Sequence, residues 1–145
     1  MSVLPRDGYC GRLRIYLAEM FPISRHLPMA VILAGSWLGL LGHLHGQWLE
    51  PLSMPVVGGA GSLFAILLAL RLMDEFKDVD VDRALFAHRP VPSGRVQLAD
   101  LAFTLRLVIG LFMVAHVLLL PGILWMATLL LGYALLMYRF FFVPQ

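Results

Sequence analysis

The chain has 145 residues, of which 60% are hydrophobic and 14% are charged, and its formal net charge is +2. So few polar side chains cannot cover the surface of a water-soluble globule, which excludes an ordinary soluble domain. The only cysteine, Cys10, excludes a disulfide within the chain and makes a poor metal site. We expect an integral membrane protein that contacts the lipid bilayer and binds no nucleic acid.

Residues 1–27 predict an amphipathic helix at the cytoplasmic membrane surface. The apolar residues that recur at helical spacing are Tyr9, Leu13, Tyr16, Leu17 and Met20. Arginines fall on other sides of this helix and interrupt its apolar residues, so the segment is not a cleavable signal. We expect an interfacial helix that chiefly anchors the positive side of the protein.

Two apolar windows follow, approximately at residues 28–48 and 55–73. Each reaches the length of about 20 residues that a helix needs to cross a hydrocarbon core of about 30 Å. The connector at residues 49–54 is so short that the two helices must form an antiparallel hairpin.

A dense acidic stretch begins the next connector, residues 74–100. If the second membrane helix continues past the membrane edge, Asp74, Asp78 and Asp82 stand at i, i+4 and i+8 along one face, with Glu75 beside them. Two carboxylates about 6 Å apart repel by on the order of 3 kcal/mol at an effective dielectric near 20. A divalent cation between them would reverse this cost, so the four acids predict a metal site.

Mg²⁺ is the expected metal, because carboxylates without Cys or helically paired His suit a hard cation that is commonly shared with substrate phosphates. Basic residues interleaved with the acids, or following them, are suited to the phosphate oxygens that the metal leaves free. They are Arg71, Lys77, Arg83, Arg89 and Arg95. Acids and bases together suggest a diphosphate ligand.

Two other interpretations compete for this stretch. A charged connector at a membrane surface is most often a solvated loop, but here the spacing is helical and the acids adjoin the hydrocarbon edge. An EF-hand loop starting at Asp78 would need Gly at its sixth position and Glu at its twelfth. Those positions hold Arg83 and Arg89, which excludes the EF-hand.

The rest of the connector predicts a turn and then a new helix. Pro90 and Pro92 forbid a helix, and Gly94 permits a turn before a helix begins near Leu98. We expect this shape to direct Arg89 and Arg95 toward the acids.

Two further windows, approximately at residues 101–120 and 122–140, form a second hairpin around Pro121. The predicted fold is therefore an all-α bundle of about four transmembrane helices. His116 lies deep in the third helix, where a hydrogen bond to a neighbouring helix is the commoner explanation for an imidazole. Small residues four apart, such as Gly35 with Gly39 and Gly58 with Ser62, predict close helix packing.

Every Lys and Arg belongs to one side of this bundle. They precede the first helix, lie around the acidic connector or end the fourth helix, and Arg106 is close enough to snorkel back to the same side. The two opposite connectors contain neither Lys nor Arg. By the positive-inside rule we expect a multi-pass protein with both termini in the cytoplasm.

Two linked motifs in the connector resemble a known family. DEFKDVDVD, at residues 74–82, resembles N/D-D-x-x-D-x-x-x-D, the first aspartate-rich motif of the UbiA superfamily of intramembrane prenyltransferases. HRPVPSGRV, at residues 88–96, resembles the R-P-[LIV]-P-[SA]-G segment that follows this motif in the superfamily. The resemblance implies a helical bundle that binds a prenyl diphosphate through Mg²⁺ and transfers the prenyl group to an acceptor. Asp74, Asp78 and Asp82 would then be metal ligands, and Arg71 would contact the diphosphate.

The resemblance covers the N-terminal half of that architecture, with residues 28–145 as half a bundle. Members carry a second acidic motif, whereas no Asp or Glu follows Asp100 in this sequence. We favour a fragment or truncated product over a split enzyme with a second half-chain, or a homodimer, and we expect little transfer by the isolated chain. The alternative function is a non-catalytic membrane subunit or a divalent-cation-binding scaffold.

Overall fold

The computed structural model describes residues 8–46, 50 and 52–140, and every regular element in them is helical. The order is α1 (Tyr9–Met20), α2 (Ile23–Leu44), α3 (Met54–Lys77), α4 (Val79–Leu85), α5 (Leu98–Leu119), the short 3₁₀ helix η1 (Pro121–Ile123) and α6 (Leu124–Phe140). The predicted all-α fold is confirmed.

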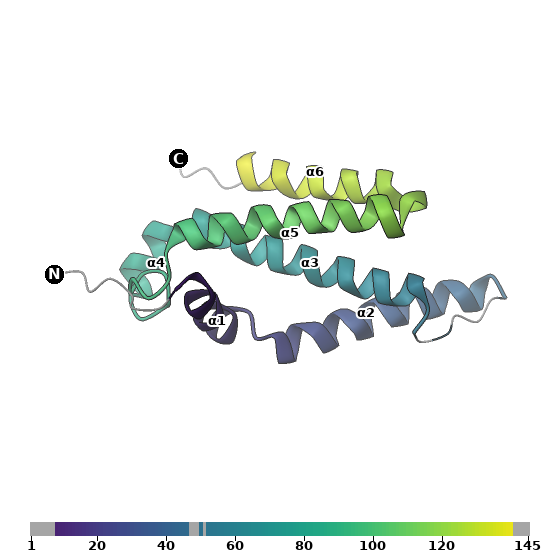
Figure 1. The fold of residues 1–145 in the computed structure, drawn as a ribbon, viewed down its shortest axis with the longest axis horizontal. Helices are drawn as coiled ribbons and strands as arrows, with labels where there is room; N and C mark the ends of the chain where they lie inside the picture. Colours follow the sequence, from purple (N-terminus) through teal and green to yellow (C-terminus); the bar gives the residue numbers. More distant parts are fainter. Residues whose placement is uncertain (1–7, 47–49, 51, 141–145) are drawn as a thin grey trace.

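Four helical segments in the described residues are long and apolar enough to cross a membrane. They are α2, α3, α5 and the segment Pro121–Tyr138. The four run side by side as two hairpins, with α3 and α5 in the middle (Figure 1). Large apolar side chains such as Trp37, Leu118 and Trp125 are more than half exposed on the outside of the bundle. Such a surface suits lipid rather than water.

The first membrane helix differs from its predicted bounds. α2 starts at Ile23 and ends at Leu44, whereas the apolar window ran over residues 28–48. Its first turn holds Ser24, Arg25 and His26, which are too polar for a hydropathy window to include. Pro28 lies inside the helix although its missing N–H removes one backbone hydrogen bond. The predicted end at Trp48 falls outside the described residues.

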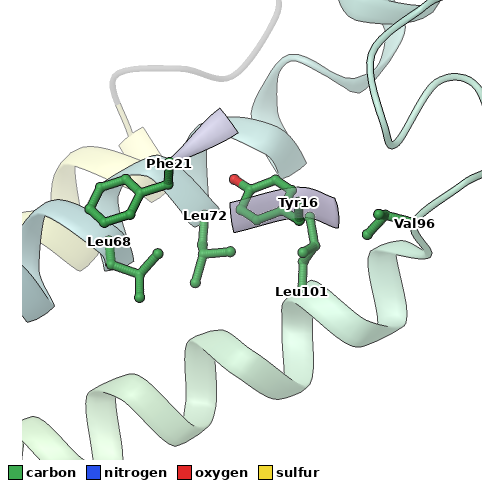
Figure 2. Close-up of a cluster of buried hydrophobic side chains, with 6 residues drawn as sticks. All are labelled: Tyr16, Phe21, Leu68, Leu72, Val96 and Leu101. Atoms are coloured by element: carbon green, nitrogen blue, oxygen red, sulfur yellow. The ribbon is translucent and has the colours of Figure 1, made fainter. Parts of the chain in front are cut away.

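The most deeply buried side chains lie where α1 meets α3 and α5. Figure 2 shows this cluster, which consists of Tyr16, Phe21, Leu68, Leu72, Val96 and Leu101. Tyr16 of α1 has no exposed surface. Burial, followed by the negative charge of Glu75, raises the pKa of its hydroxyl. The N-terminal helix therefore contributes to the core of the bundle.

Polar contacts fix α1 to the start of α5. Arg12 donates from Nε to Asp100 Oδ2 over 2.6 Å and from Nη2 to Oδ1 over 2.8 Å, which makes a bidentate pair. Tyr9 Oη and Thr104 Oγ1 share a hydrogen bond of 2.9 Å. The segment expected chiefly to anchor the positive side is thus bonded into the fold.

Small residues let α2 and α3 approach closely. Ala30 and Ala34 of α2 are buried, and a Cβ added to Gly59 of α3 would lie 3.2 Å from Leu38 Cδ1. The predicted pair Gly35 and Gly39 does not serve this contact, because Cβ atoms there would meet no atom within 4 Å.

Candidate functional site

The acidic stretch spans a break between two helices. α3 ends at Lys77 and α4 begins at Val79, with Asp78 between them at φ −96° and ψ 12°. The chain nevertheless stays coiled, because Asp78 N–H bonds to Asp74 O over 2.9 Å and Asp82 N–H bonds to Asp78 O over 2.8 Å. The expected continuous helix is therefore bent at Asp78.

The acids divide into two sets instead of forming one row. The side chains of Asp74 and Asp78 are 51% and 44% exposed, whereas those of Glu75 and Asp82 are 2% and 8% exposed. At 3.6 residues per turn, eight residues overshoot two turns by about 80°, while seven fall short by about 20°. Asp82 consequently shares a face with Glu75 and not with Asp74.

The two buried acids, Glu75 and Asp82, are each paired with an arginine. Arg71 Nη2 donates to Glu75 Oε1 over 2.5 Å, and Arg89 Nη1 donates to Asp82 Oδ1 over 2.7 Å. The Arg89 guanidinium also lies 4.0 Å from the centre of the Phe86 ring. A buried carboxylate needs such a partner, because an unpaired buried charge is strongly destabilising.

The two half-exposed acids, Asp74 and Asp78, share one cation. Lys77 Nζ lies 3.9 Å from Asp74 Oδ1 and 3.9 Å from Asp78 Oδ1. Asp80 points elsewhere: its side chain is 97% exposed and pairs with Arg83 at 3.6 Å. Asp74 and Asp78 are therefore the two carboxylates between which a positive charge is already held.

Asp74 and Asp78 fit Mg²⁺ in part. Within the described residues, no group of three or more His, Cys, Asp or Glu side chains converges on one point. Mg²⁺ commonly uses only one or two carboxylates, keeps several waters and takes its remaining ligands from substrate phosphates. A pair of half-exposed carboxylates one helical turn apart meets that lower requirement.

The connector forms the predicted turn. Gly94 has φ +77°, a conformation that favours glycine, and Gly94 N–H and Val96 N–H bond to Val91 O and Pro90 O, each over 3.0 Å. α5 then begins at Leu98, as expected, behind a capping box between Gln97 and Asp100.

The two arginines of the connector face different ways. Arg89 reaches Asp82, as expected, but Arg95 turns to α1, where it makes a bidentate pair with Glu19. Arg95 Nη2 also donates to His88 O over 2.9 Å. The hydrogen bond from Arg95 lowers the pKa of Glu19 below its ordinary value. Contacts with α1, which the sequence did not indicate, thus hold Arg95 away from the acids.

An apolar groove lies within the bundle, and no residue of the acidic stretch is among its described lining residues. It lies between α3 and α5, has a volume of about 380 Å³, and extends from Leu68 to Met54 and Leu120. Leu68 precedes Asp74 by six residues, which is about 9 Å along a helix. Among the described residues that line this groove, only Ser62 and His116 have polar side chains.

His116 joins the two central helices. Its Nε2 lies 3.3 Å from Ser62 Oγ on α3, and its Nδ1 lies 2.8 Å from Phe112 O on its own helix. The expected interhelical hydrogen bond is confirmed.

Comparisons with known proteins give no relative. No family model matches the sequence, and no curated protein and no solved structure matches it significantly. The functional argument therefore rests on the acids, the connector and the groove themselves.

Proposed function

We propose that this chain is half of a UbiA-like intramembrane prenyltransferase and binds a prenyl diphosphate through Mg²⁺ at its cationic end, on the cytoplasmic side. The observation that supports this best is the placement of Asp74 and Asp78. They flank one ammonium group, and Leu68, the nearest α3 residue that lines the apolar groove between α3 and α5, lies about 9 Å along the helix from Asp74. The motifs at residues 74–82 and 88–96 agree with this chemistry.

In this proposal Asp74 and Asp78 hold the metal, which when bound neutralises the charge of the diphosphate. Lys77, close to both acids, and Arg83, 64% exposed, are suited to phosphate oxygens. Arg71 bonds Glu75 through Nη2 while its side chain stays 26% exposed, so its other donors remain suited to the ligand. Glu75 and Asp82 position Arg71 and Arg89 without binding the metal directly.

The groove would take the prenyl chain. Its described lining residues are apolar apart from Ser62 and His116, so it favours a hydrocarbon chain and excludes water. Exclusion of water would protect an allylic cation from hydrolysis during transfer. No acid follows Asp100 in this sequence, so these residues supply one acidic cluster.

The proposal is tested by Mg²⁺-dependent binding of a non-hydrolysable prenyl diphosphate analogue to the chain in nanodiscs. Asp78→Asn should weaken binding by about tenfold or more, because it removes one charge-assisted contact. Asp80→Asn is the matched control and should leave binding within about twofold, since its carboxylate points away from the pair. Equal losses, or binding indifferent to Mg²⁺, would contradict the proposal and favour a non-catalytic membrane subunit.

A further inference from the structure

The cations at this end of the molecule are unequally paired with acids. Arg12, Arg71, Lys77, Arg83, Arg89 and Arg95 all form ion pairs with Asp or Glu. Arg14 and Arg25 are exposed, and neither forms an ion pair with a described residue. Arg14 lies in α1, six residues before its end, and Arg25 lies in the first turn of α2, beyond the turn between the two helices.

An apolar groove lies at the same turn. It has a volume of about 520 Å³, and its lining includes Leu13 and Leu17 of α1 and Ile23 at the start of α2. Arg14 and Ser24 are the polar residues that line it, and Arg25 follows Ser24 directly. The groove therefore has hydrocarbon walls and a cationic rim.

The start of α2 adds to this positive charge. α2 has no side-chain cap on its first turn and no acidic residue in it. The N–H groups of such a turn, together with the helix dipole, favour an anion close to Ile23 and Ser24.

The groove lies where the first candidate membrane span begins. α1 lies on the side of the bundle toward α4, and α2, which starts beside it at Ile23, is long and apolar enough to cross a membrane (Figure 1). A ligand there meets phosphate-binding groups at the rim and apolar side chains below it.

We propose that the groove between α1 and α2 binds one anionic phospholipid. Its phosphate contacts Arg14, Arg25 and the N-terminus of α2, and its acyl chain lies along Leu13, Leu17 and Ile23. A basic residue close to an anionic membrane surface contributes about fivefold to affinity, so the two arginines together favour an anionic over a zwitterionic lipid by more than tenfold. This inference does not depend on the prenyl diphosphate proposal.

Cys10 provides a direct readout, because it lines this groove, is exposed and is the only cysteine. We would measure its alkylation by a neutral maleimide in nanodiscs of phosphatidylcholine, with and without phosphatidylglycerol. Phosphatidylglycerol should slow the reaction in the wild-type chain, because a bound lipid covers the thiol. The double variant Arg14→Gln/Arg25→Gln should lose most of this protection, and Arg14→Lys/Arg25→Lys should keep it.

Arg106→Gln is the matched control, because Arg106 is exposed on α5 and lies outside this groove. This variant should retain the wild-type protection. Native mass spectrometry should show one phosphatidylglycerol per chain in the wild type and in Arg106→Gln. Equal slowing in the wild type and the Gln double variant would overturn the proposal. Protection of Cys10 in phosphatidylcholine alone that equals the protection with phosphatidylglycerol would also overturn it, because it indicates lipid binding without headgroup selection. Protection by soluble glycerol 1-phosphate alone would also overturn it, since it indicates a site for free phosphate.

Discussion

At the scale of single residues, the helical spacing of the acids decides which of them share a face of the helix. Asp74, Asp78 and Asp82 look like one row when counted in steps of four, but each step adds about 40° of rotation. Two steps bring Asp82 to the face of Glu75, where Arg89 and the connector cover it. Residue types and helical spacing could be taken from the sequence. The pairing of Asp82 with Arg89 also needed the path of the chain between them, where α4 ends at Leu85 and Arg89 N–H bonds to Phe86 O over 2.9 Å; spacing does not give this path.

Arg89 should therefore matter for stability more than a surface arginine does. Arg89→Ala leaves the buried Asp82 carboxylate unpaired, and we expect a loss of about 3 kcal/mol in unfolding free energy. Arg83→Ala removes an exposed pair and should cost less than about 1 kcal/mol. Thermal unfolding in detergent measures both. Adding Asp82→Asn to Arg89→Ala should recover much of the loss, and strict additivity of the two changes would contradict this explanation.

At the scale of helices, hydropathy predicted the four long apolar helices but did not predict that α1 packs against the bundle. The four apolar windows became α2, α3, α5 and α6, and the proline-rich turn ended where expected, at Leu98. α1 was recognised as amphipathic, but its apolar face packs on α3 and α5. Amphipathic spacing alone does not distinguish a helix that faces a membrane from one that faces its own bundle. The partner of Arg12 lies 88 residues away, and no local pattern indicates it.

The contact between α2 and α3 gives a prediction at this scale. Gly59→Val should lower the thermal midpoint in detergent, because a Cβ there lies 3.2 Å from Leu38 Cδ1 and overpacking costs about 1 to 3 kcal/mol. Gly35→Val adds the same side chain where no atom lies within 4 Å of the Cβ, and should not lower it. Equal effects of the two changes would mean that Gly59 is not at the point of closest approach.

At the scale of the whole molecule, the charged elements gather at one end of the bundle. α1, α4 and the connector lie there, and the end of α2, the start of α3 and the turn between α5 and α6 lie at the other end (Figure 1). We expect these two ends to face opposite sides of a membrane, with the cationic end in the cytoplasm.

Cysteine labelling tests this arrangement. In a Cys10→Ser background, Leu52→Cys and Leu85→Cys place single thiols at opposite ends, at positions that are 88% and 69% exposed. A membrane-impermeant maleimide should label only Leu85→Cys in inside-out vesicles and only Leu52→Cys in right-side-out vesicles. Labelling of both variants from the same side would refute the four-span topology.

The bidentate pair between Arg12 and Asp100 also sets an order of events during synthesis. Because 88 residues separate the two, a ribosome adding about 5 to 20 residues per second makes Asp100 roughly 4 to 18 s after Arg12. Through that interval α1 lacks Asp100, Thr104 and Leu101, so Tyr16 has no complete core to enter. The final position of α1 can be reached only after the start of α5 has left the ribosome, although α1 is made before α2, α3 and α4.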